Sequence, residues 1–326
     1  MSDRDASRDG SGDGTAGSDD SSEGPEGEAA GSESGSEGPE AEAAGSESGS
    51  EGAEGEATGS ESGSEGAEGE ATGSEGGSET TSSGFQSDLD WPIAKVGRLA
   101  MAVFAIVFAL VVASLVTELT TSTAVRFGVV GEATNAGQLF RTVVQFAGFL
   151  IAVLAYLAAT GEWNVVDVGR PRLGDAKPIV VAAAALLALQ YGALYGLRAV
   201  GVTTGQNVAV IPAGDPVTYY LAMIVVSIAV VGPVEELLFR GVVQGGLRRA
   251  FDATPAIVLA SLLFGLVHLP AVTGTLTERL AYAGVVVALG CLLGYLYERT
   301  GNVLVPGLAH GAYNAAIYAV LLAGVV

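Results

Sequence analysis

Six strongly polar side chains lie inside otherwise apolar stretches of the second half of the chain. They are Glu235, Glu236, Arg240, His268, His310 and Asn314. His268 and His310 are also the two histidines of the whole sequence. A charge near the centre of a membrane helix costs about 2.5–3.5 kcal/mol, so such groups usually face a cavity and serve a function. These six residues are therefore the candidate functional site.

Helical spacing separates the two carboxylates. At about 100° per residue, Arg240 lies near the same face as Glu236, four residues earlier, and within reach of an ion pair. Arg240 is rotated well away from Glu235. We therefore expect Glu236 and Arg240 to neutralise each other, which leaves Glu235 as the unpaired carboxylate. Two further pairs share the spacing of four: His310 with Asn314, and Phe264 with His268.

The residue types indicate water-dependent chemistry on a carbonyl group. A carboxylate beside an imidazole in a low-dielectric cleft can activate water, by taking its proton or through a bound metal ion. A second imidazole and a carboxamide can stabilise the oxyanion that then forms. This combination is typical of peptide-bond hydrolysis. The spans show no convincing serine–acid pair beside either histidine, the pattern HExxH is absent, and the single cysteine excludes a Cys-rich metal site.

Long apolar runs from Trp91 onward predict the elements that carry these residues. About 20 mostly apolar residues are needed to cross ~30 Å of hydrocarbon. The candidate spans are 97–117, 142–160, 178–199, 217–248, 255–269, 280–297 and 303–325. We expect an all-α fold: a polytopic transmembrane helical bundle of about seven spans within residues 91–326. Six or eight spans stay open, because the fourth becomes polar in its second half, the fifth is short and the seventh contains polar residues.

Positions along the predicted helices indicate that three spans meet at one depth. Glu235 and His268 each lie 13 residues from the helix end that meets their connecting turn, about 20 Å at ~1.5 Å per residue. His310 lies about seven residues into the last span, roughly 10 Å, in the same half of the bilayer. Gly232 and Pro233 predict a kink that opens a polar pocket there.

Basic residues in short loops predict the orientation of the spans. With the N-terminus inside, the cytoplasmic set is Lys95, Arg98, Arg170, Arg172, Lys177, Arg248, Arg249 and Arg299. The outer set is Arg126, Arg141, Arg198 and Arg279. We therefore expect a multi-pass protein of the cell membrane with a cytoplasmic N-terminus and an outer C-terminus.

Residues 1–85 differ sharply in composition from the rest. Of the 36 acidic residues, 25 lie in positions 1–90 beside two basic ones, whereas the remainder carries about +2. A 14-residue unit, SEGPEGEAAGSESG at 22–35, recurs at 36–49, 50–63 and 64–77 with small changes. These units have no apolar face to bury, so we expect a disordered acidic tail. A hydrated spacer is the simpler role for it and partner binding the alternative, and we expect no nucleic-acid partner.

Three motifs resemble those of a known family. EELLFRG at 235–241 matches EExxxR, FGLVH at 264–268 matches FxxxH, and HGAYN at 310–314 matches HxxxN. These are motifs of the CAAX protease and bacteriocin-processing (CPBP, or Abi) family of intramembrane proteases. YERTGNVLVPGLAH at 297–310 also resembles the family's approach to its last motif. Order and spacing fit across about residues 215–320, the expected protease core, and the three motifs together are specific.

The resemblance implies a hydrolase, an intramembrane endopeptidase that cuts a membrane-bound or lipid-modified protein or peptide within the lipid bilayer. It implies Glu235 as the water-activating base, with His268 as its partner. His310 and Asn314 would stabilise the oxyanion. The supporting residues would be Glu236, Arg240 and Phe264.

The resemblance leaves the metal and two other functions open. The family has been described as metal-dependent and as glutamate-type; Glu235, His268 and His310 could supply the three protein ligands of Zn²⁺ or work without one. We slightly favour a metal-free mechanism, although classification as a metalloprotease is expected. A catalytically silent scaffold or immunity protein is one alternative, which the intact residue set disfavours. A proton-coupled transporter is the other alternative. The sequence disfavours it, because it lacks the paired broken helices expected of many transporters.

Overall fold

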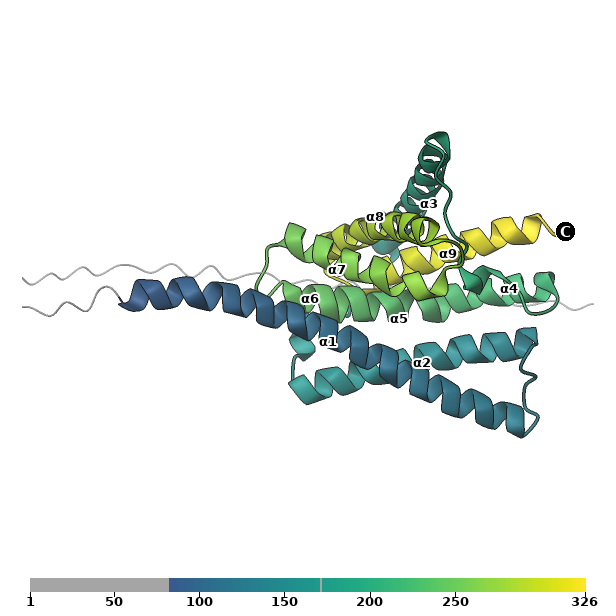
Figure 1. Ribbon diagram of the computed structural model, residues 1–326, viewed down its shortest axis with the longest axis horizontal. Helices are drawn as coiled ribbons and strands as arrows, with labels where there is room; N and C mark the ends of the chain where they lie inside the picture. Colours follow the sequence, from purple (N-terminus) through teal and green to yellow (C-terminus); the bar gives the residue numbers. More distant parts are fainter. Residues whose placement is uncertain (1–81, 171) are drawn as a thin grey trace, which may run out of the picture. The chain divides into compact units, whose positions relative to one another are not determined.

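A computed structural model describes residues 82–170 and 172–326, and the side chains from Pro92 onward. This part of the chain is all-α, as predicted, and its helices belong to one compact unit (Figure 1). The α-helices are α1 (Ser82–Arg126), α2 (Asn135–Thr160), α3 (Ala176–Ala199), α4 (Pro216–Val226), α5 (Gly232–Glu236), α6 (Gly245–Leu247), α7 (Ala253–Val267), α8 (Leu276–Thr300) and α9 (Leu304–Ala323). The predicted acidic tail lies outside the described residues, apart from its last four positions, with which α1 begins.

Seven helical segments of the described chain are long and apolar enough to cross a membrane, which confirms the predicted number. They are Pro92–Arg126, Asn135–Thr160, Leu173–Ala199, Pro216–Leu247, Ala253–Ala271, Leu276–Thr300 and Leu304–Ala323. The first is longer than the predicted 97–117, because its polar end stays helical. There the hydroxyls of Thr117 and Thr123 bond back to the carbonyls of Ala113 and Leu119, both at 2.6 Å, and so need no other partner.

The fourth span changes its helical geometry on both sides of the carboxylates. Residues 227–231 and 237–244 are π-helical, and the short α5 between them contains Glu235 and Glu236. The backbone N–H of Gly232 donates to the carbonyl of Ser227, five residues earlier. Such π-helical turns are rare and occur frequently at functional sites. The irregularity predicted at Gly232 and Pro233 therefore takes this form.

Glycines bring α9 into close contact with the fourth span. A Cβ atom on Gly232 would lie 2.4 Å from the carbonyl oxygen of Gly307, and one on Gly311 would lie 2.7 Å from the Cα atom of Ile228. Small residues spaced by four let two membrane helices approach at backbone distance. His310 lies between these two α9 glycines, so the crossing sets its side chain against the carboxylates.

The other helices surround this pair. In Figure 1, α1 and α2 run along one side of the fourth span, with α8 and α9 along the other. The α7 helix packs on α8 and on the 237–244 stretch, and α3 packs on α8 and α9. The connection from α3 to α4 is tied down by tyrosines: the Ala209 carbonyl accepts from the hydroxyls of Tyr219 and Tyr318 at 2.9 and 3.0 Å.

Candidate active site

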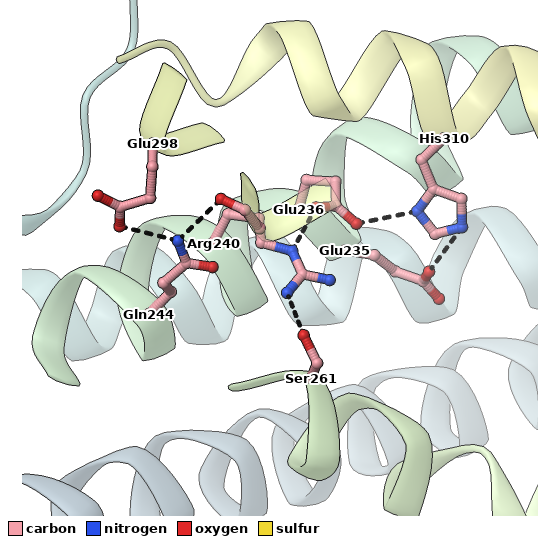
Figure 2. Close-up of polar contacts among 8 residues, drawn as sticks. Glu235, Glu236, Arg240, Gln244, Ser261, Glu298 and His310 are labelled. Carbon is pink, nitrogen blue, oxygen red and sulfur yellow. Dashed lines mark hydrogen bonds and ion pairs between the residues drawn. The ribbon is translucent and has the colours of Figure 1, made fainter. Parts of the chain in front are cut away.

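Glu236 and Arg240 form the ion pair that their spacing predicted. Both side chains are fully buried, and Arg240 Nε donates to Glu236 Oε2 at 2.7 Å (Figure 2). Arg240 Nη1 lies 3.4 Å from Ser261 Oγ, and the guanidinium lies 5.3 Å from the centroid of the Phe264 ring. The pair is thus held by α7, and its charges are balanced within the fold.

His310 lies between the two carboxylates. Its Nδ1 is 3.0 Å from Glu236 Oε1, and because a carboxylate accepts, this nitrogen is the one that carries a proton. Its Nε2 then faces Glu235, at 3.7 Å from Oε2, which is longer than a hydrogen bond (Figure 2). Glu236 therefore orients the imidazole and leaves Nε2 on the side of Glu235.

Glu235 differs from its neighbour in exposure and in partners. Its side chain is 20% exposed, whereas that of Glu236 is 0% exposed. Within the part of the chain that the structure describes, its ionic contact is the long one to His310. Glu235 is therefore the carboxylate that a substrate or a water molecule can reach.

One cavity of about 780 Å³ brings the four predicted catalytic residues together. Its wall includes Glu235, His268, His310 and Asn314. Much of the remaining wall is apolar or aromatic, including Phe239 and Phe264. A concave, largely apolar site with a few convergent polar groups is the usual form of a ligand-binding pocket.

His268 lines the cavity and contacts Phe264 on its own helix. Its Nδ1 is 2.7 Å from the Phe264 carbonyl oxygen, and its ring packs on the Phe264 ring at 4.6 Å, as the spacing of four predicted. No contact joins it to Glu235 among the described residues. The imidazole next to Glu235 is that of His310, whereas His268 lines the same cavity. Sequence spacing had set the depth of the two histidines but not how the helices rotate toward each other.

Asn314 and Arg279 complete the surroundings of the histidines. The half-buried carboxamide of Asn314 lies one turn beyond His310 and has no hydrogen-bond partner within the described range. Arg279, at the start of α8, donates from Nε to the Leu269 carbonyl at 3.0 Å. It thereby holds the turn that directly follows His268, a role that sequence reasoning missed because it treated this arginine only as an orientation signal.

Sequence reasoning also missed the polar contacts behind the ion pair. Gln244 is fully buried, and its Nε2 donates to the Gly294 carbonyl at 3.1 Å and to Glu298 Oε1 at 3.0 Å (Figure 2). Glu236, Arg240 and Gln244 thus form a stripe with a spacing of four that reaches α9, α7 and α8 in turn. The sequence did contain a signal for Gln244, because this residue continues the spacing of four beyond Arg240.

The candidate zinc ligands do not form a metal site in this arrangement. No group of three His, Cys, Asp or Glu side chains in the described chain lies close enough to hold one ion. His268 turns Nδ1 to a backbone carbonyl, and both nitrogens of His310 face carboxylates.

A comparison with known protein families points to the same segment. Residues 217–316 match the family described as "Type II CAAX prenyl endopeptidase Rce1-like". The chain is 34% identical over 96 residues to "Putative membrane peptidase YdiL" of Bacillus subtilis (strain 168), across 29% of this chain and 35% of that protein. The alignment thus spans about a third of that relative, and no solved structure matches. The segment that matches the family model contains all three motifs.

Proposed function

We propose that this multi-pass membrane protein is an intramembrane endopeptidase in which Glu235 activates water. The division between the two carboxylates carries the proposal. Glu236 is buried, neutralised by Arg240 and bonded to His310, whereas Glu235 faces the cavity without a short ion pair. A carboxylate in that position is free to act as a general base.

The proposed reaction begins with a water molecule beside Glu235 and His310. Glu235 takes a proton from the water, and the hydroxide oxygen adds to the carbonyl carbon of the substrate while the carbonyl oxygen becomes an oxyanion. The Asn314 carboxamide donates to that oxyanion, as does Nε2 of His268 when its ring is protonated. The carbon–nitrogen bond then breaks as the amine nitrogen takes the proton from Glu235. The products are a carboxylic acid and an amine.

The role of His310 follows from its two neighbours. Its Nδ1–H donates to Glu236, which fixes the ring, and Nε2 holds the attacking water together with Glu235. A histidine oriented by a buried carboxylate recurs in unrelated hydrolases. This differs from the assignment by resemblance, in which His310 binds the oxyanion and His268 assists Glu235.

The proposed substrate is a membrane-bound protein or peptide. The cavity lies among helices that have the length and composition to span a bilayer, and most of its wall is apolar. The matching family description names a prenyl endopeptidase, so substrates with and without a lipid group both belong in the test.

The proposal is tested with purified full-length protein in lipid nanodiscs and a library of membrane-tethered peptides, prenylated and unprenylated. We expect cleavage by the wild type and a loss of about 10³-fold or more in kcat for Glu235→Gln, because the base is removed without a change in shape. Glu118→Gln is the matched control, since that carboxylate is 75% exposed on α1. Full cleavage by both Glu235→Ala and His268→Ala would contradict the proposal. Absence of cleavage by the wild type would favour a scaffold, or a transporter if a proton gradient drives uptake.

Chelation tests the metal-free form of the mechanism. We expect cleavage to persist after extensive dialysis against a chelator, with less than one zinc per ten protein molecules by elemental analysis (about 0.1 equivalent). Stoichiometric zinc, together with activity that is lost on chelation and restored by Zn²⁺, would show that Glu235, His268 and His310 move together to bind an ion.

A further inference from the structure

Ser227 is a buried residue of the cavity wall to which neither the motifs nor the mechanism gives a role. It begins the first π-helical stretch of the fourth span and is only 1% exposed. Its hydroxyl is buried and has no hydrogen-bond partner in the described part of the chain. Its neighbours along the same face of the cavity are Met223, Val231 and Glu235, each a multiple of four residues away.

Several threonine hydroxyls on the spans behave differently. In a membrane helix, a serine or threonine hydroxyl commonly bonds to the carbonyl one turn earlier. Five threonines of this chain do so, over 2.6–3.0 Å: Thr117, Thr123, Thr142, Thr160 and Thr300. Ser227 has a helical backbone, yet its hydroxyl makes no such bond. Burying a donor without a partner is costly, and because Ser227 also lines the cavity, a group bound there can supply that partner.

The close helix crossing sets the level of Ser227 relative to the catalytic residues. A Cβ atom on Gly311 would lie 2.6 Å from the Ser227 carbonyl oxygen. Gly311 stands between His310 and Asn314 in α9, so Ser227 lies opposite that stretch of α9. The Asn314 carboxamide, which also lacks a partner among the described residues, lines the same cavity. Ser227 and Asn314, from different helices, thus both line the cavity in which the proposed mechanism puts the oxyanion.

We infer that Ser227 is a further catalytic residue, whose hydroxyl donates an additional hydrogen bond to the substrate carbonyl oxygen that Asn314 binds. This inference rests on the proposed endopeptidase function. It requires the Ser227 side chain, whose hydroxyl is buried, to rotate toward the cavity. No covalent bond to Ser227 is involved. Each added donor to that oxygen stabilises the charge that develops there as water adds.

The test compares Ser227→Ala with Thr121→Val in the purified full-length protein. Thr121 is the matched control, because it is 3% exposed, its hydroxyl also lacks a described partner, and it lies on α1 outside the cavity wall. For a peptide that the wild type cleaves, we expect Ser227→Ala to lower kcat by about tenfold to a hundredfold, with KM changed less than about threefold. Thr121→Val is expected to stay within about twofold of the wild type.

A thioamide at the scissile bond separates contact with the substrate from a structural effect. Sulfur accepts hydrogen bonds weakly, so loss of a donor to this atom reduces the ratio of amide to thioamide cleavage rates. We expect a smaller ratio for Ser227→Ala than for the wild type. Ser227→Cys keeps nearly the same volume but donates weakly, and we expect an intermediate rate and ratio, which guards against an alanine variant that fails to fold.

The outcomes distinguish the role of Ser227 from the proposed endopeptidase function. Cleavage by Ser227→Ala and Ser227→Cys at the wild-type kcat would overturn the assignment of Ser227. A slower reaction with an unchanged amide-to-thioamide ratio in both variants would overturn it as well, because the residue would then act on structure alone. Absence of cleavage by the wild type would overturn the endopeptidase proposal itself, and the role of Ser227 with it.

Discussion

At the scale of single residues, two adjacent carboxylates have different surroundings. Glu236 is held by Arg240 at 2.7 Å and by His310 at 3.0 Å, with no exposed side-chain surface. Glu235 keeps a fifth of its side chain exposed and faces the cavity. One residue along a helix changes direction by about 100°, which is enough to place one carboxylate in the packed interior and the other in the cavity.

This difference predicts that Glu236→Gln lowers the stability of the protein, whereas Glu235→Gln abolishes its activity and leaves its stability nearly unchanged. Glu236→Gln leaves Arg240 buried without its counter-charge, so we expect the free energy of unfolding to fall by about 3–5 kcal/mol. Glu235→Gln is expected to change it by less than about 1 kcal/mol while activity is lost. Denaturant unfolding in detergent measures both. The double variant Glu236→Gln/Arg240→Met is the control, since removal of both charges should restore part of the stability, and equal stability losses for the two glutamate variants would contradict this account.

At the scale of elements, the contact between α9 and the fourth span assembles the site. Gly232, Gly307 and Gly311 let the two backbones meet, and the crossing places His310 beside both carboxylates. The stripe of Glu236, Arg240 and Gln244 then bonds the fourth span to α9, α7 and α8. In a bilayer, where lipid is as apolar as the helices, such close packing and interhelical hydrogen bonds are what hold helices together.

Gly311→Ala tests this crossing directly. The added methyl group would lie 2.6–2.7 Å from backbone atoms of Ser227 and Ile228, so α9 must shift. We expect the free energy of unfolding to fall by about 1–3 kcal/mol, as for overpacked cores, and kcat to fall at least about tenfold because His310 moves with the helix.

Gly284→Ala is the control, because this α8 glycine has open space around it. We expect it to be neutral or slightly stabilising, since alanine favours a helix over glycine by up to about 1 kcal/mol. Equal effects of the two substitutions on thermal stability and on kcat would show that close approach at Gly311 does not position the site.

At the scale of the whole molecule, the described helices form a membrane bundle with a protected centre. In the most apolar stretch of the last span, 50% of the residues are buried within the protein, against 17% in the corresponding stretch of the third span. Large apolar side chains of α1, such as Phe104 and Val111, are more than half exposed. Lipid is the environment that accepts such surfaces. The last span, which carries His310 and Asn314, is therefore the span most enclosed by protein in the described chain.

The excess of basic residues in alternate loops predicts how this bundle lies in the membrane. In a Cys291→Ser background, which removes the single native cysteine, we expect a membrane-impermeant maleimide to label Glu132→Cys in intact cells. Gly174→Cys, in the next connection, should react only after the membrane is permeabilised. Both positions are exposed on the protein, and the reverse pattern would show that the N-terminus is outside.

The sequence by itself determined the features that depend on one helix at a time. Apolar length predicted seven spans, and a spacing of four predicted the Glu236–Arg240 and Phe264–His268 contacts. These are local properties, because the geometry of a single helix relates each residue to those one turn away. The motifs likewise identified the residues that share the cavity.

Only the tertiary structure decided which side chains meet across helices. It placed His310 rather than His268 beside Glu235, and it brought Gln244 to Glu298. It also left the Ser227 hydroxyl in the cavity wall without a described partner. Depth along a span follows from counting residues, but the rotation of one helix against another depends on packing between backbones. Here that packing is set where Gly232 meets the glycines of α9.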